Sequence, residues 1–254
     1  VFSLDRETAL SLEPDHVFPY LRSKHVVKFG LFGHDLHLVP ERRAAGGDPE
    51  ALRRDCPRTY DYLDERRDRL LERGSSWFDD GPFYSLFGVG PYTWAEYKVV
   101  WCRLGFKPHF AVVSTVDDEE LGEKTVVPGD HFMFISTDDQ YEAHFLCALL
   151  NSSVYQKSIE GIASEGKSSL SKSVISKLEL PEYQRTEESE RLAELSMDAH
   201  EIVPEHTDVS KREYNKTTIE ELAVVQAEID DLVEGMLAEG SLFPDVGQST
   251  LASY

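Results

Sequence analysis

The chain has 254 residues, 41% of them hydrophobic, which is enough to bury a core in one large domain or two small ones. It has no apolar run of about 18 residues and no basic and apolar leader, which argues against a membrane span and against secretion. Three widely spaced cysteines, Cys56, Cys102 and Cys147, predict reduced thiols in a cytoplasmic protein rather than disulfides or a zinc site. Because the chain begins with Val1, we expect it to be part of a longer protein.

The formal net charge is −21, but the charge is distributed unevenly along the chain. Residues 1–110 carry 16 Lys and Arg against 17 Asp and Glu, residues 111–184 carry 5 against 13, and residues 185–254 carry 5 against 17. Acidic surfaces repel phosphates, which argues against nucleic acid, but the nearly balanced charge of the first 110 residues departs from this pattern. An acidic chain with 11 lysines and 15 arginines is typical of proteins from salt-loving cytoplasms, so we expect a halophilic origin.

The first third of the chain predicts two strands and one helix. Residues 17–39 are expected to form a short helical turn or loop, followed by strands at VVKF and LHLV. Residues 57–73 have the apolar spacing of an amphipathic helix, for which Thr59 is the predicted N-cap and Gly74 the end.

The remaining elements predict an α+β fold. Alternating patterns predict a central, mostly antiparallel β-meander with strands over 97–104, 109–116, 123–127 and 131–136. A buried helix is expected over 139–160, and two acidic helices over 185–203 and 211–239 are expected to pair antiparallel. We therefore divide the chain into a domain over 1–184 and an acidic C-terminal helical region over 185–254.

Motifs for catalysis are weak in this sequence. It has no Walker A motif, no glycine-rich nucleotide turn after a strand, and no Asn-Pro-Pro-Tyr or Asn-Pro-Pro-Phe tetrapeptide. His34 and His37 would point to opposite faces of a strand, which argues against a shared metal. The carboxylates and lysine of 117–124 faintly resemble those of a nuclease, but a solvated acidic loop explains them better. We predict no catalytic residue, no metal and no cofactor in this chain.

The order of several segments resembles the C-terminal target-recognition domain of TaqI-like adenine-N6 DNA methyltransferases, which include type II (IIG) restriction-modification enzymes. The similar segments are Pro19–Val26, Tyr60–Leu70, Lys98–Arg103, Phe110–Ala111, Leu146–Ser152 and Gln226–Val233. Two departures concern Ser23, where the family often has glycine, and Gly235-Met-Leu-Ala, which replaces the usual Leu-Tyr-Gly-Leu ending.

The resemblance implies a role in reading DNA sequence. In such enzymes an N-terminal domain binds S-adenosylmethionine and flips the adenine, while the C-terminal domain grips the duplex. The implied partners are double-stranded DNA and a missing N-terminal catalytic domain, with self-association through the C-terminal helices as a further expectation and no membrane. A protein-interaction module of a defence complex, without base contacts, is the alternative, and a nuclease using 117–124 is a third.

A recognition domain needs cations for phosphates and polar side chains for base edges. The Gly/Ser/Lys stretch at 161–181 is interpreted as a clamp that orders on DNA, with a flexible connector as the alternative. For the other candidates the alternative is ordinary surface charge. The candidate DNA-binding residues form three clusters: Arg22, Lys24, His25 and Lys28; Arg103, Lys107 and His109; and Ser164, Lys167, Ser168, Ser169 and Lys172.

Overall fold

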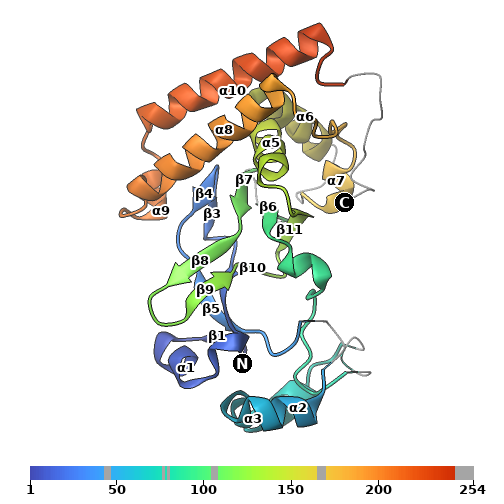
Figure 1. The fold of residues 1–254 in the computed structure, drawn as a ribbon, viewed down its shortest axis with the longest axis vertical. Coiled ribbons are helices and arrows are strands. Elements are labelled where there is room, and N and C mark those ends of the chain that lie inside the picture. Colours follow the sequence, from blue (N-terminus) through green and yellow to red (C-terminus); the bar gives the residue numbers. More distant parts are fainter. Residues whose placement is uncertain (43–46, 76–77, 79–80, 104–107, 165–169, 244–254) are drawn as a thin grey trace. The chain divides into compact units, whose positions relative to one another are not determined.

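The computed structural model describes residues 1–42, 47–75, 78, 81–103, 108–164 and 170–243. The chain divides into two compact units, which are described separately (Figure 1). Each unit is built from segments that are far apart in the sequence. Unit 1 comprises Val1–Leu21, His34–Ala95 and Ser114–Asp130, and unit 2 comprises Arg22–Gly33, Glu96–Val113 and His131–Tyr254.

Unit 1 is organised by a four-stranded sheet in the order β1-β5-β2-β10. The pair β2–β10 is parallel and the other pairs are antiparallel. A second antiparallel pair, β8–β9, turns at Gly122, whose φ of 74° suits glycine. The strands are β1 (Ser3–Leu4), β2 (Val17–Leu21), β5 (Asp35–Leu38), β8 (Thr115–Asp118), β9 (Gly122–Thr125) and β10 (Val127–Pro128).

Short helices complete unit 1, and its core contains Val17, Leu38, Leu63 and Tyr84. The core is apolar because alternate residues of the strands and one face of each helix point inward. The helices are α1 (Arg6–Ser11), η1 (Pro14–His16), α2 (Pro49–Asp55), α3 (Pro57–Asp64), α4 (Arg67–Leu71) and η3 (Pro91–Trp94).

Three predictions for unit 1 were wrong in detail. Val17–Leu21 is a strand rather than a helical turn, because it pairs with β5 and β10. The helix expected over 57–73 is broken after Asp64 into α3 and α4. Thr59 is not the N-cap: the helix begins at Pro57, and the buried Thr59 donates from its N–H (2.7 Å) and hydroxyl (2.6 Å) to Glu13 Oε2.

Unit 2 is built on an antiparallel sheet in the order β11-β6-β7. The short antiparallel pair β3–β4 packs against β7. The α5 helix covers the sheet and is itself covered by α8, which explains why nine consecutive residues from Ala143 to Asn151 are buried. The strands are β3 (Val26–Val27), β4 (Gly30–Leu31), β6 (Tyr97–Cys102), β7 (Phe110–Val113) and β11 (Phe132–Thr137), and the helices are α5 (Gln140–Asn151) and α8 (Glu187–Ile202).

The C-terminal helices α8 and α10 (Glu220–Glu239) run antiparallel and pack on each other (Figure 1). Arg191 and Glu228 form an exposed ion pair between them at 3.0 Å. The α+β class, the antiparallel sheets and the paired helices are confirmed. The expected single meander is not, because β8 and β9 form a separate pair in unit 1 and β11 pairs with β6. The second helix begins at Glu220 instead of residue 211, because the shorter elements η4 (Val203–His206) and α9 (Lys211–Tyr214) precede it. The functional boundary at 184/185 remains a prediction.

The single helix expected over 139–160 is in fact two, α5 and α6 (Ser153–Ser164), separated at Ser152, whose ψ is 152°. The buried Asn151 explains the break. Its Nδ2 donates to the carbonyl of Phe110 (2.8 Å), and its Oδ1 accepts from the N–H of Phe110 (3.2 Å). The side chain therefore pairs with β7 as another strand would, and the backbone turns away from the helix.

Asp230 of α10 holds the start of α6. Its carboxylate accepts from the N–H (2.7 Å) and the hydroxyl (2.6 Å) of Ser153, and Gln226 Nε2 donates to the same carboxylate (2.9 Å). A carboxylate at a helix N-terminus satisfies otherwise unpaired N–H groups. Two of the resembling segments, Leu146–Ser152 and Gln226–Val233, thus meet where α5 ends and α6 begins. We call this place the joint of unit 2; it comprises Phe110, Asn151, Ser153 and Asp230.

Candidate nucleic-acid interface

The first candidate cluster lies on a tight turn before β3. The N–H of Arg22 donates to His25 Nδ1 (2.9 Å), and the N–H of His25 donates to the carbonyl of Arg22 (2.8 Å). His25 is buried, whereas Arg22, Ser23 and Lys24 are exposed. The histidine ring shapes the turn, and Arg22 and Lys24 are the cations that the turn presents to solvent.

Lys28 differs from the other cations of this cluster. It is half-buried, with Nζ 5.6 Å from the centroid of the Phe29 ring. Burial lowers the pKa of Lys28, and the charge of Asp230 acts against this shift. Lys28 therefore lies in the interior of unit 2, near Phe29 and Asp230, rather than in solvent.

The second cluster is placed where β6 ends. Arg103 is exposed, its N–H donates to the carbonyl of His131 (2.8 Å), and its own carbonyl accepts from the N–H of Leu170 (2.9 Å). Trp101 Nε1 donates to the carbonyl of Leu170 (2.8 Å). His109, just before β7, is half-buried, and Lys107 lies outside the described residues.

Leu170 connects the third cluster to the second. Arg103 and Trp101 hold both backbone groups of Leu170 at the end of β6, and the exposed Lys172, two residues after Leu170, begins α7 (Lys172–Ile175). Lys167, Ser168 and Ser169 lie outside the described residues, as does the side chain of Ser164.

Within the described residues, segments of the three clusters are linked by contacts at one end of the unit 2 sheet. Trp101 and Phe110 are register partners where β6 ends and β7 begins, and the N–H of Phe29 donates to the carbonyl of Phe110 (3.0 Å). The end of β6 and the segment that leads into α7 are therefore adjacent, and residues 22–29, which carry the first cluster, contact the start of β7 through Phe29. Each cluster could be predicted from the sequence, but the contacts between their segments could not.

Most described arginines of unit 1 are used in local contacts. Arg6 donates to both carboxylate oxygens of Asp118, with one contact at 2.8 Å, and Arg58 pairs with Glu13 (3.1 Å). Arg73 donates to three backbone carbonyls, one of them that of Phe83 (2.6 Å). The ion pairs neutralise charge and the carbonyl contacts hold Arg73 within the fold, so the nearly balanced first 110 residues do not by themselves create a phosphate-binding surface in unit 1.

Lys98 and Trp101, both within a resembling segment, are buried in β6. Burial lowers the pKa of Lys98 to about 8, and the charge of Asp138 acts against this shift. Tyr92 is 48% exposed, while Trp94 is half-buried and donates from Nε1 to the carbonyl of Arg42 (3.0 Å). Trp101 therefore belongs to the core, whereas Tyr92 is exposed to solvent.

The carboxylates at 117–120 are arranged as an ion-pair cluster rather than as a metal site. The guanidinium of Arg6 and the N–H groups of Glu120 and Leu121 hold the Asp118 carboxylate, and the Arg6 hydrogen bond is the main cause that lowers its pKa. Within the ranges that the structure describes, no three His, Cys, Asp or Glu side chains are grouped to hold a metal ion. Nothing in this geometry favours the nuclease alternative.

One cysteine–histidine pair occurs in unit 1, with His16 Nε2 3.2 Å from Cys56 Sγ. Burial raises the pKa of Cys56, and the charges of Glu13, Asp15 and Asp55 raise it further. Burial lowers the pKa of His16. Both shifts favour a neutral thiol beside a neutral imidazole, which is the opposite of an activated thiolate.

We expect Cys56 to react with iodoacetamide at pH 7.5 about severalfold more slowly than a cysteine in an unstructured peptide, because only the thiolate is nucleophilic. Asp15→Asn should increase the rate, since it removes a charge that opposes ionisation. Mass spectrometry of the alkylated chain over time measures both rates. A rate above that of the peptide would show an activated pair.

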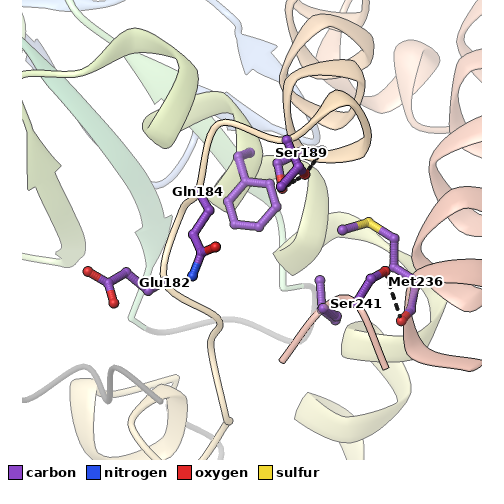
Figure 2. Close-up of a pocket in the computed structure, with 8 residues that line it drawn as sticks. Glu182, Gln184, Ser189, Met236 and Ser241 are labelled. Atoms are coloured by element: carbon purple, nitrogen blue, oxygen red, sulfur yellow. Dashed lines mark hydrogen bonds between the residues drawn. The ribbon is translucent and has the colours of Figure 1, made fainter. Parts of the chain in front are cut away.

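A shallow pocket of unit 2 is poorly suited to a phosphate. Figure 2 shows Glu182, Gln184, Ser189, Met236 and Ser241 around it, and its described lining includes a carboxylate and no cation. Ser241 Oγ donates to the carbonyl of Met236 (3.4 Å), which is a contact within the fold. The candidate interface is therefore the convergent end of the β6–β7 sheet.

Comparison with known proteins gives one informative similarity. The chain is 27% identical over 145 residues to the type II methyltransferase M.NspV of Nostoc sp. (strain ATCC 29411 / PCC 7524). The match covers 57% of this chain and 29% of that protein, so the chain spans less than a third of its relative. No protein-family model matches the chain. The similarity supports a relation to type II methyltransferases.

Among the described helices, none is both long and apolar enough to cross a bilayer.

Proposed function

We propose that this chain is the DNA sequence-recognition part of an adenine-N6 DNA methyltransferase from a restriction-modification or phage-defence system. The observation that carries the proposal is the convergence of Arg22, Lys24, Arg103 and Lys172 on one end of the unit 2 sheet. The similarity to a type II methyltransferase and the order of the resembling segments support the same conclusion.

The convergent cations would set the register of the chain on the duplex by contacting phosphates. Arg22 and Arg103 also have the planar donor pair that recognises a guanine edge. The acidic helices α8 and α10 would repel the phosphates and so restrict the orientation of the DNA. In this proposal S-adenosylmethionine and methyl transfer belong to a catalytic domain outside this chain, which is its second partner.

A protein-interaction role is the second candidate, and one feature of α10 favours it. Val224 is 59% exposed and Leu237 is 37% exposed on this acidic helix. Such side chains would suit docking on a catalytic domain or on a second copy of the chain. This role is compatible with DNA recognition, and becomes the sole candidate if the chain binds no DNA.

The proposal is tested by incubating the chain with a pool of random duplexes at low and at molar potassium chloride and sequencing the retained DNA. An enriched motif supports base recognition. Retention without enrichment would reduce the role to a phosphate contact, and no retention at either salt concentration would overturn the proposal. Both salt conditions are needed because phosphate contacts weaken steeply as salt rises.

We expect Arg22→Ala, Lys24→Ala and Arg103→Ala each to weaken duplex binding by about fivefold to tenfold at low salt. Each variant that loses a phosphate contact should also make the slope of log K against log salt shallower by about 1. Fluorescence anisotropy titrations at several salt concentrations measure both quantities. Arg69→Ala, an exposed cation of α4 in unit 1, is the control with the same change of charge. Equal losses in all four variants would contradict a localised interface.

A further inference from the structure

Lys211, at the start of α9, was not selected by sequence analysis because it lies in the acidic C-terminal region. Its Nζ donates to three backbone carbonyls, those of Ser23 (3.3 Å), Lys24 (2.7 Å) and Val26 (3.0 Å). A lysine ammonium has three donors and no acceptor, so these contacts use its full hydrogen-bonding capacity. Burial lowers the pKa of Lys211, and the neighbouring Cys102 acts against this shift.

The three carbonyls belong to the turn that presents Arg22 and Lys24. When the carbonyls of a turn converge on one cation, the backbone around them is held in a single arrangement. The internal hydrogen bonds between Arg22 and His25 close the turn, and the N–H of Phe32 donates to the carbonyl of His25 (2.6 Å). The ammonium therefore completes a framework that already includes the buried histidine.

A second contact fixes α9 to the same region of unit 2. The rings of Phe32 and Tyr214 pack edge to face with centroids 5.1 Å apart. Ser210 caps the helix, accepting on its hydroxyl from the N–H of Glu213 (3.3 Å). The helix is therefore attached at both ends, and Lys211 is supported in the geometry that its three contacts require.

We propose that Lys211 is a positioning residue for DNA recognition: it holds the turn at 22–26 in the shape that presents Arg22 and Lys24 to the duplex. This inference rests on the proposed function, and it gives the acidic C-terminal region a part in the interface that its charge alone would exclude. Lys211 itself contacts no DNA in this arrangement, because the turn occupies all three of its donors.

The first test uses amide hydrogen exchange of the 254-residue chain without DNA. We expect Lys211→Met to speed exchange of the His25 and Phe32 amides by about tenfold, because these N–H groups are bonded within the turn. Lys211→Arg should give the same result, since a planar guanidinium cannot direct donors to three converging carbonyls. Lys216→Met, an exposed lysine after α9, is the matched control. Unchanged exchange in both Lys211 variants would overturn the inference.

The second test is a double-mutant cycle on duplex binding. We expect Lys211→Met to weaken binding by about fivefold to twentyfold, a range typical of coupled sites. Combined with Arg22→Ala and Lys24→Ala, it should weaken binding no further, because the side chains that the turn presents are already absent. Additive losses, or a Lys211→Arg variant that binds like the wild type, would overturn a positioning role and indicate a direct phosphate contact.

The two tests separate the inference from the function on which it rests. If the wild-type chain binds no duplex, the proposed function fails, and the DNA part of the inference fails with it. The exchange result still decides whether Lys211 holds the turn. If the wild type binds and the Arg22 and Lys24 variants weaken binding while Lys211→Met does not, only the inference fails.

Discussion

Asn151→Ala is expected to lower the free energy of unfolding by about 2 to 4 kcal/mol, because a buried polar group left without its partner costs about 1 to 3 kcal/mol and the cavity adds to this cost. Asn151 is fully buried and exchanges two hydrogen bonds with the backbone of Phe110. Alanine would leave the N–H and the carbonyl of Phe110 without these partners and would add a small cavity. The joint between α5, α6 and β7 would lose the side chain that defines it.

Urea denaturation followed by circular dichroism measures this loss. Asn215→Ala is the matched control because Asn215 is exposed, and it should change stability by no more than about 0.5 kcal/mol. Asp230→Ala should also destabilise the chain, since Ser153 would lose two hydrogen bonds at the start of α6. A loss below about 1 kcal/mol for Asn151→Ala would contradict the role we assign to this joint.

Acidification from pH 7 to pH 5 is expected to destabilise the chain by about 3 kcal/mol through two core histidines. The rings of His144 and His200 lie 4.8 Å apart at 86°. Nε2 of His200 accepts from the N–H of Val112 (2.8 Å), so Nδ1 carries the proton and donates to the carbonyl of Ser196 (2.6 Å). His144 Nδ1 lies 3.1 Å from the hydroxyl of Ser196. This arrangement suits two neutral rings.

The direction of the effect follows from the pKa values. Burial lowers the pKa of His144 to about 3 and that of His200 to about 4, from 6.5. Between pH 6.5 and about 4 the unfolded chain binds more protons than the folded chain, so stability falls as the pH falls. The free energy of unfolding is therefore unaffected by the protonation of these two histidines above pH 6.5 and decreases progressively below this pH. At pH 5 each histidine accounts for about 1.5 to 2 kcal/mol.

Urea denaturation at pH 7 and pH 5 tests this expectation. His144→Phe keeps a ring in the core but cannot titrate, so it should remove about half of the pH-dependent loss. The same substitution at the exposed His131 should leave the pH dependence unchanged. Equal pH dependence in the wild type and in His144→Phe would show that the buried ring is not the source.

The family resemblance has a structural explanation in this chain. Asn151 and Ser152 break the helix, Asp230 caps the next helix, and Phe110 pairs with Asn151. These residues belong to three of the resembling segments, and they hold unit 2 together rather than face solvent. Such a joint determines the scaffold of unit 2 and leaves the exposed turns free to differ in sequence.

Local patterns were sufficient to predict the α+β class, the antiparallel strands of the sheet and the paired acidic helices, because alternation and 3.6-residue periodicity reflect which face of an element is buried. Contacts between residues far apart in sequence decided the rest. Thr59, the predicted N-cap, is instead a buried donor because the carboxylate of Glu13 accepts its hydrogen bonds. Asn151 ends a helix that its periodicity would have continued, because its side chain pairs with the backbone of Phe110. The convergence of the cation clusters, and the three carbonyls around Lys211, depend on pairings that no local pattern encodes.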